Sequence, residues 1–532
     1  MTTTAKPEMT KAPSAWWQRA LDKLPVPSES MTMVALGAIV LVIAILTVTP
    51  WPVGAFQDDA MYTVLAKSLA EGKGYRFINL PGEPNATHFP PGYPLLLAAL
   101  WRLWPSFPDN IVLFKFANAA LLAAAALGAF RFARQRFAAS VVVATGVAVI
   151  GTLSIVVLLV TGVIMSEPLF LALLFPALLV TERVVDRGRL RDAALAGLLL
   201  GALSLVRTLG VFAIPAACLV LVLRRRWVCA LVLGLAAMAL LVPWQWWVGA
   251  HQGEIAPVLV GKYGSYGAWL VDGYQQGGVN FALGVIRRNV AELDGMLSYY
   301  FMPVVARWPR TVVMAAVGAF ALLGTKRFYR NAPASLLFLG LYTLVIMLWP
   351  FEPARFVLGV WPLWPLLVGS GVLAAWRLAA PVPSARVVVV ALTLAFVGGS
   401  GWYNAIGYSR KWWVSVQRDA GQRAKPIVEW AARYTDSTSV LSTEDDLIVY
   451  LYANRKAVPT STFMASQRLT PLSDAQDVDW VRQIFRDYRP SWFIVGSRQG
   501  SRTAATLAAS PDSLLRYVGH TPDVLIYQRT TP

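Results

Sequence analysis

Residues 33–53 read MVALGAIVLVIAILTVTPWPV, and the polar segment Gln57-Asp58-Asp59-Ala60-Met61-Tyr62 follows shortly afterwards. The apolar run is long enough to cross a bilayer as a helix, which takes about 20 residues. Comparable runs recur along most of the chain, and only 14% of its 532 residues are charged, whereas a soluble protein has about a quarter. The sequence therefore predicts a polytopic α-helical membrane protein.

We expect about eleven transmembrane helices. The first is read as a retained span and not as a signal peptide, because no small-residue cleavage site follows it cleanly. The expected spans cover residues 31–50, 110–130, 138–157, 163–181, 192–207, 209–223, 227–248, 311–324, 333–350, 356–376 and 386–403.

Basic residues predict the orientation of these spans. Short connections rich in Lys and Arg, such as 131–137 and 183–191, alternate with connections that are not. The positive-inside rule puts the basic connections, and the leader 1–30, in the cytoplasm. Much of the net charge of +18 then reflects topology and does not indicate nucleic-acid binding. We expect a multi-pass protein of the inner (plasma) membrane with a cytoplasmic N-terminus.

Two long connections and the tail fall on the opposite, extracytoplasmic side. The connections are residues 51–109 and 249–310, called loop 1 and loop 2 below, and the transmembrane domain spans 31–410. The remaining residues, 411–532, alternate helix-like and strand-like segments, enough for one small α/β domain. We expect the acidic turn Thr443-Glu444-Asp445-Asp446 in this domain to be a solvated turn, since it lacks the ligand spacing of a calcium loop.

Two adjacent carboxylates, Asp58 and Asp59, stand where loop 1 begins. The residues after them predict an amphipathic helix lying on the membrane surface and ended by Gly72 and Gly74. Helical spacing puts Tyr62 on the same face as Asp58. The alternative is that one of the carboxylates simply caps this helix.

Further polar residues are expected at the same membrane face. His88 and Tyr93 belong to the stiff segment HFPPGY near the end of loop 1, where the alternative is a turn with an incidental His. Glu167 stands at the outer end of a span, where a carboxylate is costly and often functional. The alternative for Glu167 is a polar helix-start residue, since Pro168 suits the first helical position.

Two arginines, Arg207 and Arg355, are predicted at outer helix ends, where positive-inside statistics disfavour them. Each suggests a buried anion, either a carboxylate or a phosphate. For Arg355, an ion pair with Glu352 three residues earlier is a local alternative.

Acids, a His and arginines at the level of lipid headgroups indicate an enzyme acting on a lipid-phosphate-linked substrate. If a sugar is joined through C1 to a polyprenyl phosphate, a carboxylate acting as general base deprotonates an acceptor hydroxyl. Attack from the opposite face inverts C1, and positive groups stabilise the departing phosphate. A lipid carrier suits the outer face, where no nucleotide is available.

The sequence also resembles a known family. It is similar to the GT-C superfamily of integral-membrane glycosyltransferases, nearest to the protein O-mannosyltransferase and lipid A aminoarabinose transferase group. The resemblance rests on the order and spacing of DDAMYTVLAKSLAEGKGY (58–75), HFPPGYPLLLA (88–98), MSEPLFLALL (165–174), LAGLLLGALSLVRTLGVFAIPA (195–216) and PARFVLGVWPLWPLL (353–367).

The resemblance implies a catalytic Asp in loop 1, two surface helices there, and a polyprenyl-phosphate sugar donor. Asp58 matches the catalytic Asp and Asp59 the second acidic position. His88 stands where aminoarabinose transferases commonly have Lys, and Arg355 matches an arginine that contacts the donor phosphate. Together the residues predict Asp58 and Asp59 as catalytic, Arg355, His88 and Arg207 as phosphate ligands, and Tyr62, Tyr93 and Glu167 as substrate-binding residues.

The expected acceptor is an envelope glycan, lipid or protein bearing a hydroxyl or a phosphate, and the expected partners include membrane lipids but no nucleic acid. No cofactor is predicted; a divalent metal between Asp58 and Asp59 stays open, although no ligand spacing supports it. The rival class is a transporter or flippase of lipid-linked sugars, which more often shows internal repeats and charges at mid-span.

Overall fold

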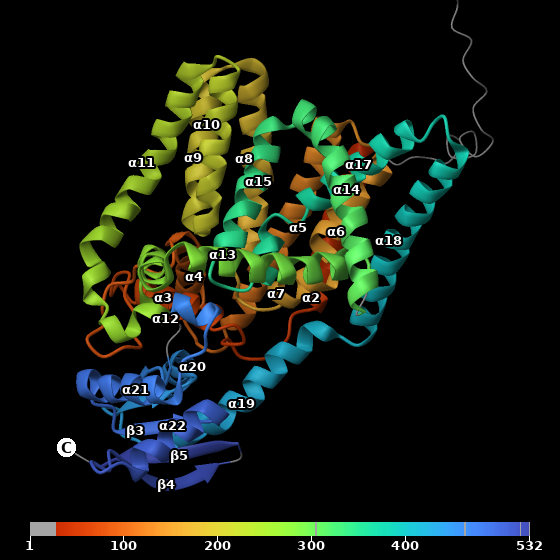
Figure 1. Cartoon of the computed structure of the whole chain (residues 1–532). Helices are drawn as coiled ribbons and strands as arrows, with labels where there is room; N and C mark the ends of the chain where they lie inside the picture. The colour runs from red at the N-terminus through yellow and green to blue at the C-terminus, as the bar shows by residue number, and fades with distance from the viewer. Residues whose placement is uncertain (1–27, 304–305, 462–463, 522, 531–532) are drawn as a thin grey trace, which may run out of the picture.

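The protein is a bundle of long helices with a small sheet domain at one end (Figure 1). The computed structural model describes residues 28–303, 306–461, 464–521 and 523–530. The predicted leader 1–30 lies almost entirely outside the described residues. Seven of the described helices are long and apolar enough to cross a membrane, and a bent pair gives up to eight. The predicted class, a polytopic helical protein with a small C-terminal α/β domain, is confirmed, whereas the number eleven stays a prediction.

Each predicted span is helical over most of its length. The bent helix is α16 (Pro353–Phe356) and η4 (Val357–Gly359), which turn by 78° into α17. The other helices of the bundle, in chain order, are α2 (Glu29–Leu46), α5 (Ile111–Phe137), α6 (Val141–Leu153), α7 (Ile155–Thr161), α8 (Glu167–Arg187), α9 (Leu190–Val206), η1 (Thr208–Phe212), α10 (Ala213–Leu223), α11 (Trp227–His251), α14 (Arg307–Asn331), α15 (Pro333–Leu348), α17 (Leu363–Leu378) and α18 (Pro383–Ser409).

Small residues allow the helices of the bundle to approach closely. A Cβ atom added to Gly371 in α17 would lie 1.7 Å from the carbonyl oxygen of Phe320 in α14. A Cβ atom on Gly197 in α9 would lie 2.3 Å from the carbonyl oxygen of Leu233 in α11. Close backbone approach at small residues is typical of packing between membrane helices.

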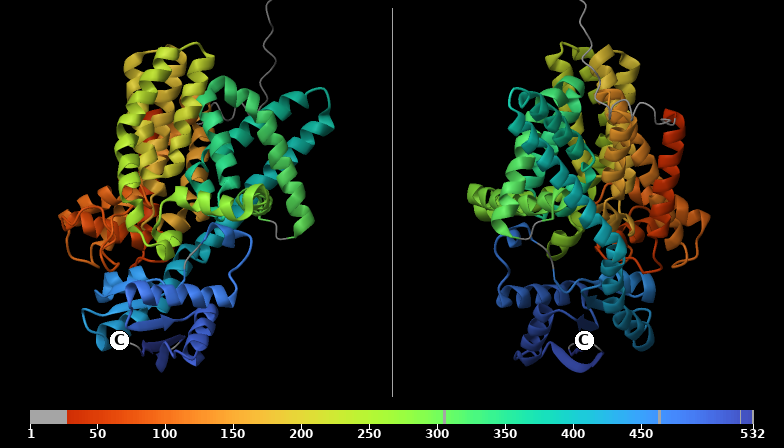
Figure 2. Two further views of the ribbon diagram at one scale, coloured as in Figure 1. Left: turned by 60° about the vertical axis from the view of Figure 1, so that its left-hand side comes forward. Right: turned by 90° about the vertical axis from the view of Figure 1, so that its right-hand side faces the viewer.

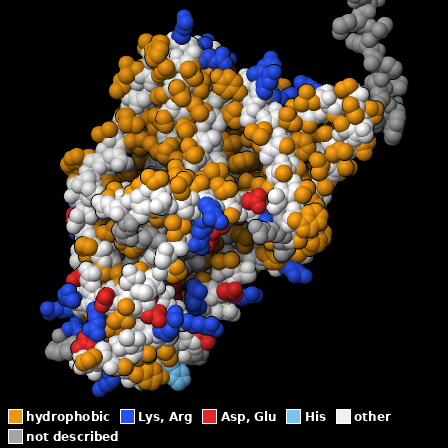
Figure 3. Space-filling view, viewed as in Figure 1, with side chains coloured by type: hydrophobic (Ala, Val, Ile, Leu, Met, Phe, Trp, Pro, Cys, Tyr) orange, Lys and Arg blue, Asp and Glu red, His pale blue; other side chains and the backbone are white. Residues whose placement is uncertain are grey.

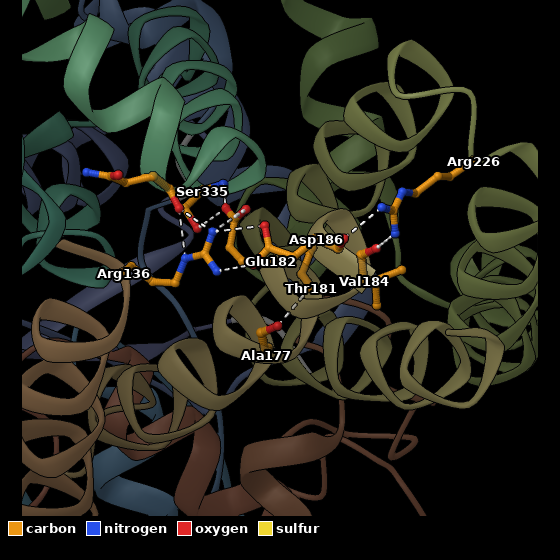
Figure 4. A network of polar contacts seen from close by, with 9 residues as sticks. Arg136, Ala177, Thr181, Glu182, Val184, Asp186, Arg226 and Ser335 are labelled. Atoms are coloured by element: carbon orange, nitrogen blue, oxygen red, sulfur yellow. Dashed lines mark hydrogen bonds and ion pairs between the residues drawn. The ribbon is translucent and has the colours of Figure 1, made fainter. Parts of the chain in front are cut away.

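A buried carboxylate joins three helices at the end of the bundle far from the sheet domain (Figure 4). Glu182 of α8 accepts hydrogen bonds of 2.8 Å from both the backbone N–H and the hydroxyl of Ser335. Ser335 lies in the first turn of α15, where backbone N–H groups have no partner within the helix. Arg136 of α5 lies 4.0 Å from Glu182 and bonds Asp186 at 2.5 Å. This Glu182 cluster therefore joins α5, α8 and α15.

Loop 1 contains α3 (Asp58–Ala70) and α4 (Gly92–Leu103). Gly72 and Gly74 follow α3 with positive φ angles of 73° and 85°, as expected of residues that end a helix. The prediction that α3 lies on the membrane surface is wrong. Residues on all sides of α3 are buried, because α4 and the sheet domain cover it, and a helix buried all round lies inside the protein.

Loop 2 contains a helix that the sequence did not indicate. It begins with η2 (Gln252–Glu254), η3 (Pro257–Leu259) and α12 (Val260–Tyr263), and continues as α13 (Tyr266–Phe301). Helix α13 has a break at Gly278, where φ is 54°. It lies across the end of the bundle, between the long helices and the sheet domain (Figures 1 and 2).

The tail domain, residues 412–530, holds one five-stranded mixed sheet in the order β2-β1-β3-β5-β4. Strand β1 pairs in parallel with β2 and β3, and β5 pairs antiparallel with β3 and β4. The elements are α19 (Trp412–Tyr434), β1 (Val440–Thr443), α20 (Asp446–Ala453), β2 (Lys456–Val458), η5 (Ala465–Arg468), α21 (Asp474–Tyr488), β3 (Trp492–Val495), α22 (Arg498–Ala509), β4 (Leu515–Thr521) and β5 (Val524–Arg529).

The tail domain packs firmly on both loops. Buried residues of loop 1, of loop 2 and of the tail form one apolar core that includes Phe77, Leu259 and Ile448. The prediction that the acidic turn is solvated is wrong, because the Asp446 side chain is only 1% exposed. Charged side chains gather over the rest of the tail domain, while apolar side chains cover the bundle (Figure 3).

Candidate active site

A cavity of ≈ 970 Å³ lies where α13, both loops and the bundle meet. This volume suits a ligand the size of a sugar with part of a lipid chain, since ligand pockets commonly enclose about 300–1,000 Å³. Five of the eight predicted site residues line this site cavity: Asp58, Tyr62, His88, Arg207 and Arg355.

Four charged side chains, Asp58, Glu167, Arg207 and Arg355, form an ionic quartet at the cavity. Nη2 of Arg355 lies 2.6 Å from Oδ2 of Asp58, and its Nε lies 3.0 Å from Oε1 of Glu167. Nη1 of Arg207 lies 2.7 Å from the same oxygen of Glu167. Two carboxylates and two guanidinium groups cancel in charge, so the quartet is neutral as it stands.

The contacts of Arg355 exclude one of the alternatives that the sequence left open. The ion pairs of Arg355 among the described residues are with Asp58 and Glu167, so the local pair with Glu352 is wrong. Both arginines face carboxylates, so a phosphate would have to compete with these carboxylates for them.

Helix ends bring the quartet together from distant parts of the sequence. Asp58 is the first residue of α3 and Glu167 the first of α8, where the partial positive charge of a helix N-terminus favours an acid. Arg207 follows the last residue of α9 in an extended conformation, and Arg355 lies in the short helix α16 before the bend. The quartet therefore depends on how four helix ends meet.

Asp59 does not face the site cavity. It is fully buried, and its two oxygens accept backbone N–H bonds from Gly54 at 2.7 Å and Phe56 at 3.2 Å. Burial raises the pKa of Asp59, and the bonds from Gly54 and Phe56 partly oppose that rise. These contacts fix the turn before α3, so the position of Asp59 favours a structural role over the predicted catalytic one.

His88 lines the cavity in a form that does not suit phosphate binding. Its Nδ1 lies 2.6 Å from the carbonyl oxygen of Gly264, so Nδ1 carries the hydrogen. Burial lowers the pKa of His88, against the opposing effects of Gly264 and Asp58, and the ring is neutral at pH 7. A neutral ring lacks the charge that an anion site uses. The geometry therefore favours a role for His88 in forming the cavity wall over its predicted role as a phosphate ligand.

The three predicted substrate-binding residues lie in different places. Tyr62 lines the cavity, and its hydroxyl lies 3.2 Å from that of Ser166, which also accepts a bond from Arg207. Tyr93 is fully buried and donates to Asn118 at 3.1 Å. Glu167, only 1% exposed, holds the two arginines from behind.

Sequence reasoning missed several further polar side chains that line the cavity, among them two arginines and a glutamine. Arg288 comes from α13, whereas Gln467 and Arg468 come from the tail domain. Arg468 donates to Asn289 at 2.7 Å and pairs with Glu292. No local signal marks these positions, because they reach the cavity only through the fold. Within the described residues, no group of three or more His, Cys, Asp or Glu side chains is placed to hold a metal ion.

Comparison with known proteins places the fold. Neither protein-family models nor curated proteins match the sequence. Two solved structures of ArnT from Cupriavidus metallidurans do match the structure. The one bound to undecaprenyl phosphate is 13% identical, covers 94% of this chain and 97% of its own, and has a TM-score of 0.50. The apo structure is 12% identical, with coverages of 93% and 97% and a TM-score of 0.52. The predicted polytopic architecture is confirmed at the level of the fold, and the chain has an ArnT-like fold.

Proposed function

We propose that this protein is an inverting glycosyltransferase that moves a sugar from a polyprenyl phosphate to an acceptor hydroxyl or phosphate at the outer face of the plasma membrane. The observation that carries the proposal is the position of Asp58, a carboxylate 28% exposed to the site cavity, beside the guanidinium group of Arg355. A base and an anion ligand therefore stand side by side, as this reaction needs.

The donor phosphate is expected at Arg355 and Arg207. A planar guanidinium group binds phosphate oxygens through two parallel hydrogen bonds, and Glu167 holds both arginines at the cavity. Apolar side chains next to Arg207, including Val206, Leu209 and Phe212, line the same cavity and suit the first isoprene units. That a neighbour in fold binds undecaprenyl phosphate supports a donor of this class.

Donor binding changes the surroundings of the base. Arg355 pairs with Asp58, and a phosphate that binds Arg355 competes with Asp58 for this guanidinium group. Asp58 then turns to the acceptor with its full charge. The donor therefore frees the base that its own transfer requires, which limits reaction to the complex that holds both substrates.

The transfer step follows from this arrangement. The acceptor O–H bond breaks and its proton passes to Asp58, while the acceptor oxygen forms a bond to C1 of the sugar. The bond between C1 and the phosphate oxygen breaks, and its electron pair leaves with the lipid phosphate. Arg355 and Arg207 stabilise the charge that develops on that oxygen. Attack opposite to the leaving group inverts C1.

The proposed orientation puts the site cavity and the tail domain outside the cytoplasm. It rests on the Lys and Arg residues at the far end of the bundle, which the positive-inside rule assigns to the cytoplasm. Figure 3 shows Lys and Arg side chains at that end, with a band of apolar side chains below them. Labelling of single introduced cysteines from outside intact cells tests this orientation.

The function is tested with purified protein in nanodiscs and a panel of radiolabelled sugars on polyprenyl phosphate. We expect release of lipid phosphate with formation of a glycosylated acceptor, loss of this activity in Asp58→Asn, and normal activity in Glu429→Gln. Glu429 is a matched control because its carboxylate is 67% exposed on α19. In sealed proteoliposomes, movement of the intact lipid-linked sugar across the bilayer, without cleavage of its C1–O bond, would favour the flippase instead.

A further inference from the structure

The acidic turn before α20 is the strongest feature that the proposed reaction leaves unexplained. Asp446, the first residue of α20, is buried in the tail domain's contact with loop 2. Its Oδ1 lies 2.6 Å from Nζ of Lys262, and its Oδ2 accepts a bond from the hydroxyl of Tyr263. Both partners belong to α12, so a single carboxylate of the tail holds this short helix of loop 2.

Helix α12 leads directly to the wall of the site cavity. The residue after it, Gly264, offers the carbonyl oxygen that His88 bonds at 2.6 Å. A Cβ atom on Gly264 would lie 2.6 Å from the carbonyl oxygen of Val260, so the chain turns tightly there. His88 lines the cavity, and so does Tyr266, at the start of α13. Asp446 is therefore linked to the cavity through α12 and then through the bond between Gly264 and His88.

The other side of α20 contacts the turn that carries Asp58. The hydroxyl of Tyr452 accepts a bond of 3.2 Å from the backbone N–H of Val53. Ile448 packs so closely on Gly54 that a Cβ atom on that glycine would lie 2.2 Å from its side chain. The backbone N–H of Gly54 in turn bonds Asp59, next to Asp58.

We propose that α20 is a positioning element of the active site, and that Asp446 is the residue through which α20 positions the cavity wall at His88. Asp446 touches neither substrate in this scheme. It holds α12 so that the Gly264 carbonyl orients the His88 ring, while Ile448 and Tyr452 hold the turn before Asp58. The tail domain thereby sets the relative position of the two sides of the cavity. The effect on transfer rests on the function proposed above.

The test compares Asp446→Asn with the neighbouring variant Asp445→Asn. Asp445 is a neighbouring control, because its ion pair, at 4.0 Å, is with Arg423 of α19, and it acts on Lys262 of α12 only through a longer-range charge interaction. Hydrogen–deuterium exchange is followed over residues 258–267 and 86–92 in the full chain. We expect faster exchange in both segments for Asp446→Asn, and exchange like that of the wild type for Asp445→Asn. Should Asp446→Asn fail to insert, Tyr263→Phe removes one bond to the same carboxylate and takes its place.

Turnover supplies a second readout that general destabilisation would not reproduce. We expect kcat/KM to fall roughly tenfold in Asp446→Asn, with no further fall when His88→Ala is added, because the effects of two groups that act through the same chain of contacts are not additive. Effects that multiply in the double variant would overturn the proposal, as would unchanged exchange over 86–92. If the wild type transfers no sugar at all, the proposed function fails, and exchange over 86–92 alone decides whether Asp446 acts on His88.

Discussion

Replacing Asp58 by Asn is expected to move transfer and donor affinity in opposite directions. The amide has nearly the same shape but cannot take a proton, so transfer should fall by about 10²-fold or more. The same change removes the charge that pairs with Arg355. A lipid phosphate then meets less competition for that guanidinium group and should bind more tightly.

The size of the gain follows from the contact that is lost. A hydrogen bond to a charged group contributes about 1.5–3 kcal/mol. The side chains of Asp58 and Arg355 are 28% and 22% exposed, and solvent screening reduces the contribution toward about 1 kcal/mol. The amide oxygen of Asn retains part of the bond. Since 1.4 kcal/mol is a tenfold change, the full loss of about 1 kcal/mol would be about fivefold, and we expect the Kd for undecaprenyl phosphate to fall by about two- to fivefold.

Binding of fluorescent undecaprenyl phosphate to protein in nanodiscs measures this Kd without any chemistry. Wild type, Asp58→Asn and the exposed control Glu429→Gln are compared at one ionic strength, because screening affects the result. Weaker binding in Asp58→Asn would show that Asp58 helps to hold the lipid, for example through a shared proton. Near-normal transfer in the same variant would remove Asp58 from the role of base.

Three further expectations concern other contacts. Arg355→Ala should weaken binding of undecaprenyl phosphate and slow transfer. Arg355→Lys should show only part of the wild-type binding and rate, because the planar guanidinium group is lost. Normal binding by the Ala variant would leave Arg355 a purely structural role. Glu182→Ala should lower the free energy of unfolding by about 2 kcal/mol, since two buried donors of Ser335 lose their acceptor. Thermal unfolding in detergent measures this loss, and the activity per folded molecule should not change. Burial lowers the pKa of His88 in the folded protein. As the pH falls, the unfolded chain, with an ordinary pKa of ~6.5, therefore binds a proton at His88 before the folded protein does. The stability that His88 contributes is present above pH ~6.5 and is lost as the pH falls through the lowered pKa. The melting temperature should therefore fall more between pH 7 and 5 for the wild type than for His88→Asn, and parallel curves would contradict the lowered pKa.

Spans and candidate residues were accessible from the sequence because both leave local signals. A bilayer requires apolar runs of a set length, and these runs correspond to the helices of the bundle, from α2, the first of them in the chain, to α18, the last. Charged residues at the ends of these apolar runs stand out against them, so Asp58, Glu167, Arg207 and Arg355 were all identified. Their mutual pairing was not, since Arg355 had a plausible partner three residues away in Glu352 and took two distant ones instead.

The errors share one physical cause. When a residue is covered by segments far away in the sequence, the residues next to it in the chain show no pattern that indicates this covering. Helix α3 reads as a surface helix because its covering, α4 and α20, lies elsewhere in the sequence. The turn at Asp446 reads as solvated because its partners, Lys262 and Tyr263, belong to loop 2. Asp59 and Asp58 are neighbours with identical side chains, and only the fold turns one to the cavity and the other to the Gly54 turn.

The place of α20 in the chain bears on how the protein matures. Every member of the ionic quartet has been synthesised by residue 355, whereas α20 comes only in the final part of the chain, after the last long helix of the bundle. A nascent chain that has inserted all its long helices still lacks the contacts of Ile448 and Asp446 with the two loops. Under the orientation and function proposed above, activity should therefore begin late, once the tail has crossed the membrane and folded, so that an incomplete chain does not consume lipid-linked sugar during its own biogenesis.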